Sequence, residues 1–448
     1  MSPSTDISIA RRPLITTRKV VHISMLAFAF LLPILTWVQA AGCAILALLF
    51  NIFLLPRLAV DLRKGRDRTT SDWTGVVLYP ISVLALILLY RHHLHVAASA
   101  WAILALGDGI ASVAGESLRG PALPWNSEKR WSGFLAFALA GAAGAYVLAR
   151  WVAPAFPAEK AFLVSIAGAL VGALVESVPV RLDDNVSVPL VTGGFLFCAY
   201  LMEWSALGAN LPYLSQRAIF AVGINAFFAL LALGLKFIDR SGAAAGFFLG
   251  VAIYLGYGWK SFLILFAFFV LGSLATRVGY ASKAKRGVAE RRGGRRSWRE
   301  ATANSLAGAF FAVLVITTHH EAAFLVALVA AFAEAAGDTV SSEIGQWLSQ
   351  RAYLITTFKP VPAGEDGGVS IGGTLAGFMA SAIVVAVGFG LGLCGPGGTA
   401  LAWGAALAGN LLDSLLGATI ERRGLVTNGI VNFTGTSFAG AVALVFML

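Results

Sequence analysis

Apolar residues run along the chain in about fifteen blocks of roughly 17 to 23 residues, separated by short polar links. Each block is long enough to cross a hydrocarbon core about 30 Å thick as a helix that rises 1.5 Å per residue. The pattern therefore predicts an all-α, polytopic membrane protein of about fifteen transmembrane helices. The expected spans are 20–38, 40–55, 73–90, 95–114, 133–150, 161–178, 187–206, 216–235, 241–257, 259–276, 300–318, 321–337, 368–392, 399–418 and 428–447.

The composition excludes a water-soluble globule of this length. Of 448 residues, 58% are hydrophobic and 12% are charged, which leaves too little polar surface to cover a soluble core. The three cysteines stand singly in apolar blocks, so neither disulfides nor a thiolate metal site is expected. No small-residue cleavage site follows the first block, which favours a retained first helix over a signal peptide.

The basic residues predict the orientation, because short cytoplasmic links carry an excess of Lys and Arg. With the N-terminus in the cytoplasm, all but five of the 33 Lys and Arg residues fall on the inner side. The net charge of +10 is then mostly a topology signal, and no nucleic-acid partner is expected. We expect an inner or plasma membrane location, with functional sites that face the cytoplasm. The five outer residues are Arg91, Arg150, Lys160, Arg217 and Lys260.

Two segments recur in the same order in the two halves of the chain. GDGIASVAGE (107–116) matches GDTVSSEIGQ (337–346), and ALVGALVES (169–177) matches ALAGNLLDS (406–414). Fixed-order matches of this kind indicate an internal repeat. The repeated helices are separated by an even number of spans, so the two bundles are expected to be parallel. We expect domains at 1–210 and 211–448, with a boundary near 208–216.

Acidic residues inside membrane spans are costly and indicate function. Asp108, Ser112 and Glu116 are four residues apart and share a helical face. Asp338 and Ser342 repeat that face in the second half, and the second match sets Glu176 opposite Asp413. All lie near expected cytoplasmic helix ends, where a nucleotide and hydrated Mg²⁺ have access.

The links that follow the acidic helices carry cations and glycines. The first link supplies Lys129 and Arg130, and the second supplies Lys359, Gly367 and Gly368. Phosphoryl transfer requires cations on the phosphates, carboxylates for Mg²⁺ and close backbone approach, and each half contains all three. The chain has no GxxxxGKS/T motif, so no soluble-type nucleotide fold is embedded in it.

For two features of the chain, the sequence leaves two interpretations open. His22 follows basic residues at an expected inner helix edge, where it either packs at the interface or contacts substrate. The basic run 277–299 is either a solvated cytoplasmic loop or a surface that attracts anionic lipid headgroups.

Several of these motifs resemble known families. RKVVH (18–22), LGDGIASVAGE (106–116), EKRWSG (128–133) and LVESVPVRLDDNVSVP (174–189) resemble the phytol kinase and dolichol kinase family of CTP-dependent polyprenol kinases. GDTVSSEIG (337–345), LITTFKPVPAGEDGGVS (354–370) and GNLLDSLLGATIE (409–421) resemble the phytyl phosphate kinase family. The resemblance implies a fusion of consecutive steps, from a prenyl alcohol such as phytol, geranylgeraniol or farnesol to its monophosphate and then its diphosphate, with CTP and Mg²⁺. The first half lacks the Lys-Thr pair of the family before Gly133, so the cation that reaches the phosphates there is left open.

Two other functions remain as alternatives. The LVES segment (174–177) also resembles CDP-diacylglycerol synthase, which implies cytidylyl transfer, although the downstream Lys-Asp and Gly-His-Gly-Gly stretches of that family are absent. Duplicated bundles are also compatible with a lipid transporter or flippase. That function predicts charge near the middle of the bilayer, whereas these acids lie near inner helix ends.

The candidate site residues fall into four groups. The expected catalytic residues are Asp108, Glu176, Asp184, Asp338 and Asp413. The expected nucleotide-binding residues are Ser112, Lys129, Arg130, Asn185, Ser342, Lys359, Gly367, Gly368 and Ser370. The expected metal ligands are Asp108, Glu116, Glu176, Asp183, Asp338, Glu343 and Asp413, and the expected contacts to the lipid substrate are His22, Asn304 and Asn410.

Overall fold

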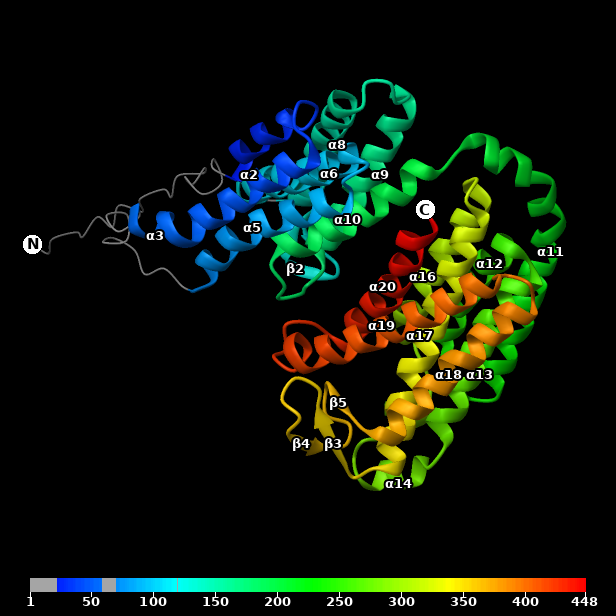
Figure 1. Cartoon of the computed structure of the whole chain (residues 1–448). Coiled ribbons are helices and arrows are strands. Elements are labelled where there is room, and N and C mark those ends of the chain that lie inside the picture. The colour runs from blue at the N-terminus through cyan, green and yellow to red at the C-terminus, as the bar shows by residue number, and fades with distance from the viewer. Residues whose placement is uncertain (1–21, 59–69, 119) are drawn as a thin grey trace, which may run out of the picture. The chain divides into compact units, whose positions relative to one another are not determined.

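The computed structural model describes residues 22–58, 70–118 and 120–448, and 79% of it is helical (Figure 1). Twelve of the described helices are long and apolar enough to cross a membrane, which confirms an all-α polytopic membrane protein. The three other expected blocks are helical too, as the shorter apolar helices His22–Leu31 and Gly75–Leu89 and as α12 (Arg240–Tyr257). The basic stretches in 1–21 and 59–69, and Arg119, lie outside the described residues, and the orientation stays a prediction.

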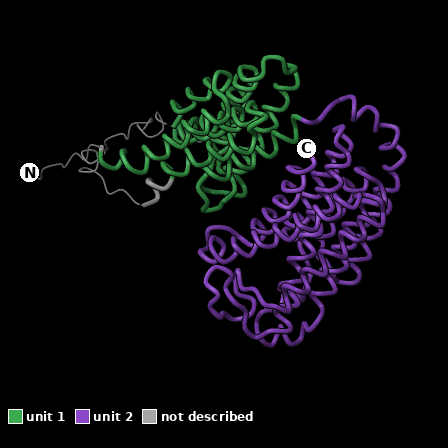
Figure 2. Tube along the Cα trace, viewed as in Figure 1, with its two compact units in different colours: residues 1–200 green, residues 201–448 purple. Residues whose placement is uncertain are grey.

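The chain divides into two compact units, residues 1–200 and 201–448 (Figure 2). The boundary expected from the sequence lies some ten residues later, near 208–216. In the structure this stretch is part of a continuous helix, α11 (Trp204–Gly234). Proline at position 212 lies inside this helix, which membrane helices tolerate.

Unit 1 contains eleven helical segments and one β-hairpin in its described part. In chain order these are η1 (Met25–Leu31), α2 (Trp37–Leu49), η2 (Phe50–Leu54), α3 (Leu55–Leu58), α5 (Thr70–Leu89), α6 (Leu94–Ala102), η3 (Ile103–Asp108), α7 (Gly109–Ser117), β1 (Ala122–Leu123), β2 (Asn126–Arg130), α8 (Trp131–Val152), α9 (Ala158–Ser177) and α10 (Asp184–Leu201).

Unit 2 is built mainly from long apolar helices, with a small antiparallel sheet of order β4-β3-β5 at one end of them (Figure 1). After α11 and α12 follow α13 (Trp259–Arg277), α14 (Tyr280–Lys285), α15 (Arg291–Gly294), α16 (Trp298–Thr317), α17 (Glu321–Leu348), β3 (Arg351–Leu354), β4 (Pro360–Pro362), β5 (Gly368–Val369), α18 (Ile371–Gly390), α19 (Pro396–Leu416), η4 (Gly417–Glu421) and α20 (Asn428–Met447).

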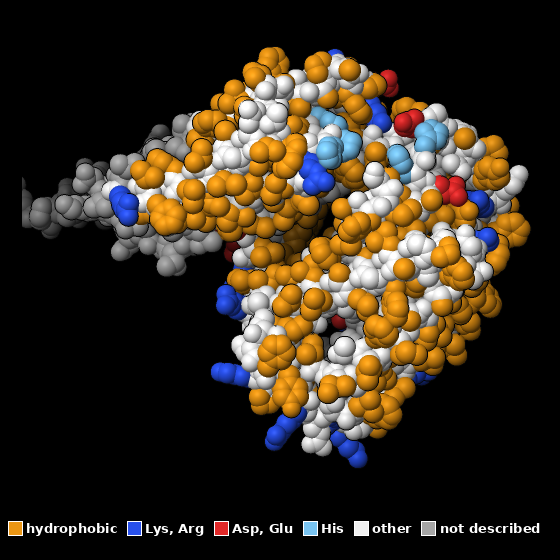
Figure 3. Space-filling model, in the orientation of Figure 1, with side chains coloured by type: hydrophobic (Ala, Val, Ile, Leu, Met, Phe, Trp, Pro, Cys, Tyr) orange, Lys and Arg blue, Asp and Glu red, His pale blue; other side chains and the backbone are white. Residues whose placement is uncertain are grey.

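One helix at the centre of each unit carries the repeated Gly-Asp motif. In the continuous helix Leu94–Ser117, 72% of the most apolar 18-residue stretch is buried, and in α17 the share is 83%. These are the two highest values among the helices that could cross a membrane. In unit 2, α17 packs against α13, α16, α18, α19 and α20. Hydrophobic side chains cover much of the visible outer face (Figure 3), as expected for helices that contact hydrocarbon. The acidic motifs therefore lie on the helices most shielded from lipid.

The central helix and the helix that follows the small sheet or hairpin approach each other through glycines. In unit 1 a Cβ added to Gly133 would lie 3.1 Å from the carbonyl oxygen of Ala111 and 3.7 Å from the Cα of Gly115. In unit 2 a Cβ added to Gly373 would lie 3.0 Å from the Cα of Gly345. Small residues permit such close helix contacts in membranes. Gly115 and Gly345 are equivalent positions of the sequence repeat, so both units use the same contact.

A short extended segment lies between these two helices in each unit. In unit 1 it is the antiparallel β1-β2 hairpin, and in unit 2 it is the β4-β3-β5 sheet. These strands have two to five residues, too few for a period-2 pattern to be recognised. They fold the cation-bearing links back toward the helix ends.

Two of the helices contain a π-helical turn that ends on an acidic residue. Segment η3 ends on Asp108, and η4 ends on Glu421. A π-turn adds a residue to a helix and is frequent at functional sites. It changes the direction in which the following side chains point.

We expect Gly373→Ala to lower the free energy of unfolding by about 1–3 kcal/mol, because the new methyl group meets backbone on the facing helix. Gly372→Ala is the matched control, since its Cβ lies 3.1 Å from the end of the Leu348 side chain, which can move. Thermal unfolding in detergent would show a large shift for the first variant and a small one for the second. Equal shifts would contradict the close contact.

Candidate active site

Three carboxylates meet in unit 1. Asp108 ends η3, Glu176 lies one residue before the end of α9, and Asp184 begins α10. One oxygen from each lies within 4.8 Å of the others. Carboxylate oxygens at this spacing, partly open to solvent, match the ligand preference of Mg²⁺.

The hairpin places a cation directly on this group. Lys129, on β2, forms an ion pair with Glu176, and its Nζ lies 3.7 Å from Oδ2 of Asp184. Burial disfavours the charge on Lys129, but the two carboxylates outweigh it and raise the pKa of this lysine. The ammonium is therefore held in its charged form beside the carboxylates.

Side chains of the hairpin anchor it to the end of α9. Asn126 Nδ2 donates to the carbonyl oxygen of Ser177 at 3.0 Å, and Trp125 Nε1 donates to the Ser177 hydroxyl at 3.0 Å. Ser177 is the residue after Glu176 in the chain. Lys129 and Glu176 are thus fixed to the same piece of structure.

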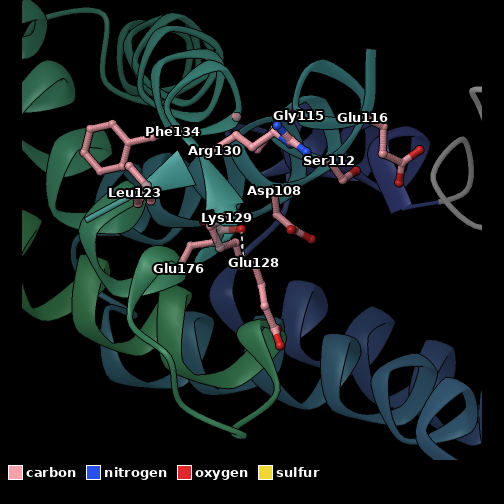
Figure 4. Close-up of a pocket in the computed structure, with 12 residues that line it drawn as sticks. Asp108, Ser112, Gly115, Glu116, Leu123, Glu128, Lys129, Arg130, Phe134 and Glu176 are labelled. Carbon is pink, nitrogen blue, oxygen red and sulfur yellow. Dashed lines mark hydrogen bonds and ion pairs between the residues drawn. The ribbon is translucent and has the colours of Figure 1, made fainter. Parts of the chain in front are cut away.

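A cavity of about 640 Å³ opens beside this group (Figure 4). Asp108, Ser112 and Glu116 all line it, as expected for residues on one helical face. In Figure 4, Asp108, Lys129 and Glu176 lie close together, whereas Glu116 lies at the edge with its carboxylate directed away from them. The remaining lining residues are Ala111, Gly115, Leu123, Glu128, Arg130, Gly133 and Phe134.

His22 lies behind Asp108. Its Nε2 is 3.8 Å from Oδ2 of Asp108 and 3.4 Å from the carbonyl oxygen of Leu104. Its ring packs edge-on against Tyr79, at 4.7 Å between centroids. The histidine is therefore both packed in the unit and in position to orient Asp108.

Three other expected site residues lie near the three carboxylates but have other hydrogen-bond partners. They are Asp183, Asn185 and Arg130. The Asp183 carboxylate accepts hydrogen bonds from the backbone N–H and the side-chain amide of Asn185, at 2.9 and 2.7 Å. Arg130 donates to the carbonyl oxygen of Gly120 at 2.8 Å. Of the two adjacent aspartates considered from the sequence, the structure brings Asp184 to the carboxylate group.

A second carboxylate group lies in unit 2. Asp338 is on α17 and Asp413 is on α19, and the charges of the two carboxylates act on each other. Glu334, one turn before Asp338, is 1% exposed. A Cβ added to Gly435 on α20 would lie 3.1 Å from Cδ of Glu334 and 3.6 Å from Cβ of Asp413. The glycine therefore leaves the space in which these two acids face each other.

Asparagines surround this second group. Asn432 Nδ2 lies 3.5 Å from Oδ2 of Asp338 and 3.3 Å from Oδ1 of Asn304. Asn410 Nδ2 donates to the carbonyl oxygen of Glu334 at 3.3 Å. Asn304 and Asn410 were expected to contact the lipid; the structure places Asn410 against the backbone of Glu334 and Asn304 against Asn432.

The carboxylate group of unit 1 has the spacing of a divalent-cation site, whereas Glu334, Asp338 and Asp413 do not bring one oxygen each within 4.8 Å of one another. Three ionised carboxylates repel one another in a buried site, so they require a proton or a shared cation. In unit 2, both oxygens of Glu334 and Oδ2 of Asp413 have no hydrogen-bond partner within the described residues. Buried polar atoms left unpaired are rare in folded proteins, so these oxygens are available to a proton or a cation.

Glu343, expected as a metal ligand, is instead part of a buried ion pair. Lys283 on α14 is fully buried and donates to the Glu343 carboxylate at 2.5 Å and to the carbonyl oxygens of Ala275 and Thr276 at 3.3 and 3.1 Å. The lysine thus joins the C-terminal end of α13 to α17. The structure brings Glu334, which the sequence analysis did not select, to Asp413.

Arg296, from the basic run 277–299, is a cation whose charge acts on Asp338 of the second group. Its backbone is held by hydrogen bonds to Phe237 and Asp239, both 3.0 Å. Burial lowers the pKa of Arg296, while the charges of Glu343 and Asp338 act in the opposite direction. Lys359, the cation expected from the sequence, is exposed in the turn between β3 and β4.

The other residues expected to bind nucleotide in unit 2 have local structural roles or are exposed. Ser370 caps α18 by accepting from the backbone N–H of Gly373 at 3.2 Å. Gly367 has a φ of +71° and packs against Ala418 of η4, where no side chain fits. Gly368 follows it in β5, and Ser342 is exposed on α17. Their contact with a nucleotide stays a prediction.

Comparison with known proteins gives the family. Residues 223–440 match the model described as integral membrane protein DUF92. Uncharacterized membrane protein sll0875 of Synechocystis sp. is 35% identical over 240 residues, which cover 52% of this chain and 90% of that protein. The chain belongs to the DUF92 family. No solved structure matches it.

Several relatives of this chain that carry names come from plants. Protein VTE6, chloroplastic, of Arabidopsis thaliana is 40% identical over 48% of this chain and 66% of that protein. Probable phytol kinase 3, chloroplastic, of Glycine max is 29% identical over 39% of this chain and 60% of that protein. The chain is thus related to membrane kinases of a prenyl alcohol. The plant relatives are chloroplastic by name, and the plasma membrane location expected here stays a prediction.

We expect Lys129→Met to tighten Mn²⁺ binding in unit 1 about tenfold, because the carboxylates lose the ammonium that competes with the metal. Lys129→Arg keeps the charge and is the control. Electron paramagnetic resonance of bound Mn²⁺ measures this in an Asp413→Asn background, which impairs the site in unit 2. A weaker affinity in the methionine variant would contradict the proposed competition.

In unit 2, Glu334→Gln and Glu343→Gln distinguish the two candidate ligands. In an Asp108→Asn background we expect Glu334→Gln to weaken Mn²⁺ binding about tenfold or more, since it removes a charged ligand. Glu343→Gln should leave Mn²⁺ binding nearly unchanged but cost about 3–5 kcal/mol of stability, because Lys283 stays buried without its anion. The reverse pattern would restore Glu343 as the ligand.

Proposed function

We propose that the chain is a bifunctional lipid kinase that converts a prenyl alcohol to its monophosphate and then to its diphosphate, with CTP as phosphoryl donor. The observation that carries this proposal is that each unit has a carboxylate group with a nearby cation, and that two acids of each group, Asp108 and Glu176 in unit 1 and Asp338 and Asp413 in unit 2, are equivalent in the sequence repeat. The relation to proteins named phytol kinase supports the substrate class. The domains 1–210 and 211–448 are proposed to perform the first and second step.

Both steps are transfers of the γ-phosphoryl group. In the first, the alcohol oxygen bonds to the γ-phosphorus of CTP, the bond between that phosphorus and the β,γ-bridging oxygen breaks, and CDP leaves. The proton of the alcohol passes to a carboxylate or to water. In the second, an oxygen of the lipid monophosphate attacks the γ-phosphorus of another CTP in the same way, which forms the diphosphate.

In unit 1, Asp108, Glu176 and Asp184 would hold Mg²⁺, which would neutralise charge on the nucleotide phosphates. Lys129 contacts two of these carboxylates and lines the cavity, so its ammonium is in position to stabilise the transferring group. Arg130 lines the same cavity. His22 orients Asp108, and the carboxylate nearest to the alcohol would take its proton.

In unit 2, Asp338, Asp413 and Glu334 would hold the ion. Arg296 supplies a positive charge near Asp338. Lys359 lies on the exposed turn between β3 and β4. It would contact the nucleotide only once the nucleotide is bound. The buried carboxylates of this unit are also compatible with an ion-coupled transporter, so the assay for transfer has to exclude that function.

We expect Asp108→Asn to reduce alcohol phosphorylation about a hundredfold or more and to spare monophosphate phosphorylation, because each variant removes charge from one site only. Asp338→Asn should do the opposite. The measurement is transfer of ³²P from γ-labelled CTP to phytol or to phytyl monophosphate in detergent. Glu159→Gln is the control, since Glu159 is an exposed carboxylate at the opposite end of α9 from Glu176.

Three outcomes would overturn parts of this proposal. Equal loss of both activities in both variants would exclude two independent sites. Label transferred from α-labelled CTP would indicate cytidylyl transfer, and no transfer from CTP, ATP or GTP to any prenyl alcohol or prenyl phosphate would exclude a kinase. A higher rate with ATP or GTP would change the donor alone.

A further inference from the structure

A second cavity, of about 290 Å³, lies wholly within unit 2. It is formed by α11, α12, α13 and the start of α16, and phenylalanines make up much of its wall, among them Phe228, Phe262, Phe266 and Phe269. Phe228, Phe262 and Phe266 pack on one another, with ring centroids 5.0–6.2 Å apart. The wall is therefore a stable apolar surface suited to a hydrocarbon chain.

One end of this cavity is polar and carries one cation and one anion. Arg296 and Glu300 both line it. The Glu300 carboxylate accepts from the backbone N–H of Ser297 at 2.6 Å and from its hydroxyl at 2.5 Å, as the capping box of α16. Because Glu300 is held by these bonds, Arg296 provides the charge that a ligand would meet.

Arg296 also borders the carboxylate group of unit 2. A Cβ added to Gly272 on α13 would lie 2.7 Å from Nη2 of Arg296 and 3.2 Å from Cγ2 of Thr339. Thr339 is the residue after Asp338, and the charge of Asp338 acts on Arg296. The guanidinium thus lies between the apolar cavity and the proposed site of phosphoryl transfer.

We infer that this cavity holds the isoprenoid tail of the lipid monophosphate, with the phosphate bound by Arg296 beside Asp338. The inference rests on the proposed function, and it names the tail site and the headgroup anchor of the second step. An apolar wall with one cation at its end selects an anionic amphiphile over a neutral alcohol. A phosphate bound at Arg296 would lie next to the carboxylates of the proposed site. This position suits the lipid monophosphate that reacts there, and not a phospholipid of the surrounding membrane.

A glycine in the wall allows the cavity to be filled without disturbing the fold. Gly246 on α12 lines the cavity, and a Cβ added there has open space, with no atom within 4 Å. Gly223 on α11 has the same open space but is exposed and does not line the cavity. Gly223→Phe is therefore the matched control for Gly246→Phe.

We expect Gly246→Phe to raise KM for phytyl monophosphate about tenfold or more, because several methylene groups lose their apolar surroundings. KM for geranyl monophosphate, whose tail is half as long and meets less of the wall, should rise clearly less, and both constants in Gly223→Phe should change less than about twofold. Equal effects on both substrates, or none, would overturn the tail site. This result leaves the kinase proposal intact if wild-type protein transfers phosphate.

A binding experiment tests the same site without catalysis. A prenyl monophosphate with a diazirine in its tail should label peptides of α12 and α13, and unlabelled phytyl monophosphate should compete, whereas phytol should not. Arg296→Gln should lower labelling about tenfold, with partial recovery in Arg296→Lys. Labelling elsewhere, or equal competition by phosphatidic acid, would overturn the inference. Labelling as expected in a protein that transfers no phosphate would overturn the proposed function alone.

Discussion

The structure depends on how the charge of its carboxylates is compensated. These carboxylates lie within or at the ends of apolar helices. An isolated acid in a membrane span costs several kcal/mol, and each unit places at least three of them together. In unit 1 the compensation comes from Lys129, which contacts Glu176 and Asp184. In unit 2 it comes from Arg296 and from amide donors such as Asn432. Each group of acids is stable only where a link between helices delivers such partners, and a bound divalent ion would add to them.

This requirement explains the architecture around the two groups. The central helices are shielded from lipid, glycines let the next helix approach closely, and a short extended segment follows the acidic helix in each unit. In unit 1 this segment fixes the lysine and the glutamate to one rigid piece of structure through Ser177. Phosphoryl transfer uses the same combination of charges, so the interactions that stabilise the fold also prepare the site.

The sequence predicted the helices and the acidic positions, and it did so for physical reasons. Apolar blocks of membrane length and acids inside them are strong local signals, so the fifteen blocks are helical, and Asp108, Glu176 and Asp184 come together. Glu334 was missed although it lies in an apolar span four residues before Asp338, on the same helical face. Arg296 was missed because a basic link is normally solvated, and only the tertiary structure shows that this arginine turns toward the carboxylates. Glu343 was predicted to bind metal because the sequence does not reveal its ion-pair partner, Lys283, which is sixty residues away in the chain.

The π-turn that ends on Asp108 sets the phase of the helix that follows it. Its wide turn takes up one residue more than a regular α-helical turn. If the same residues formed regular α-helix, everything after Asp108 would rotate by about 100° about the helix axis. Ser112 and Gly115 would then leave the cavity and the glycine contact together, without any change in hydrophobicity. A single-residue deletion within 103–108 that restored regular α-helix would keep the phase, whereas the same deletion elsewhere in this helix would change it.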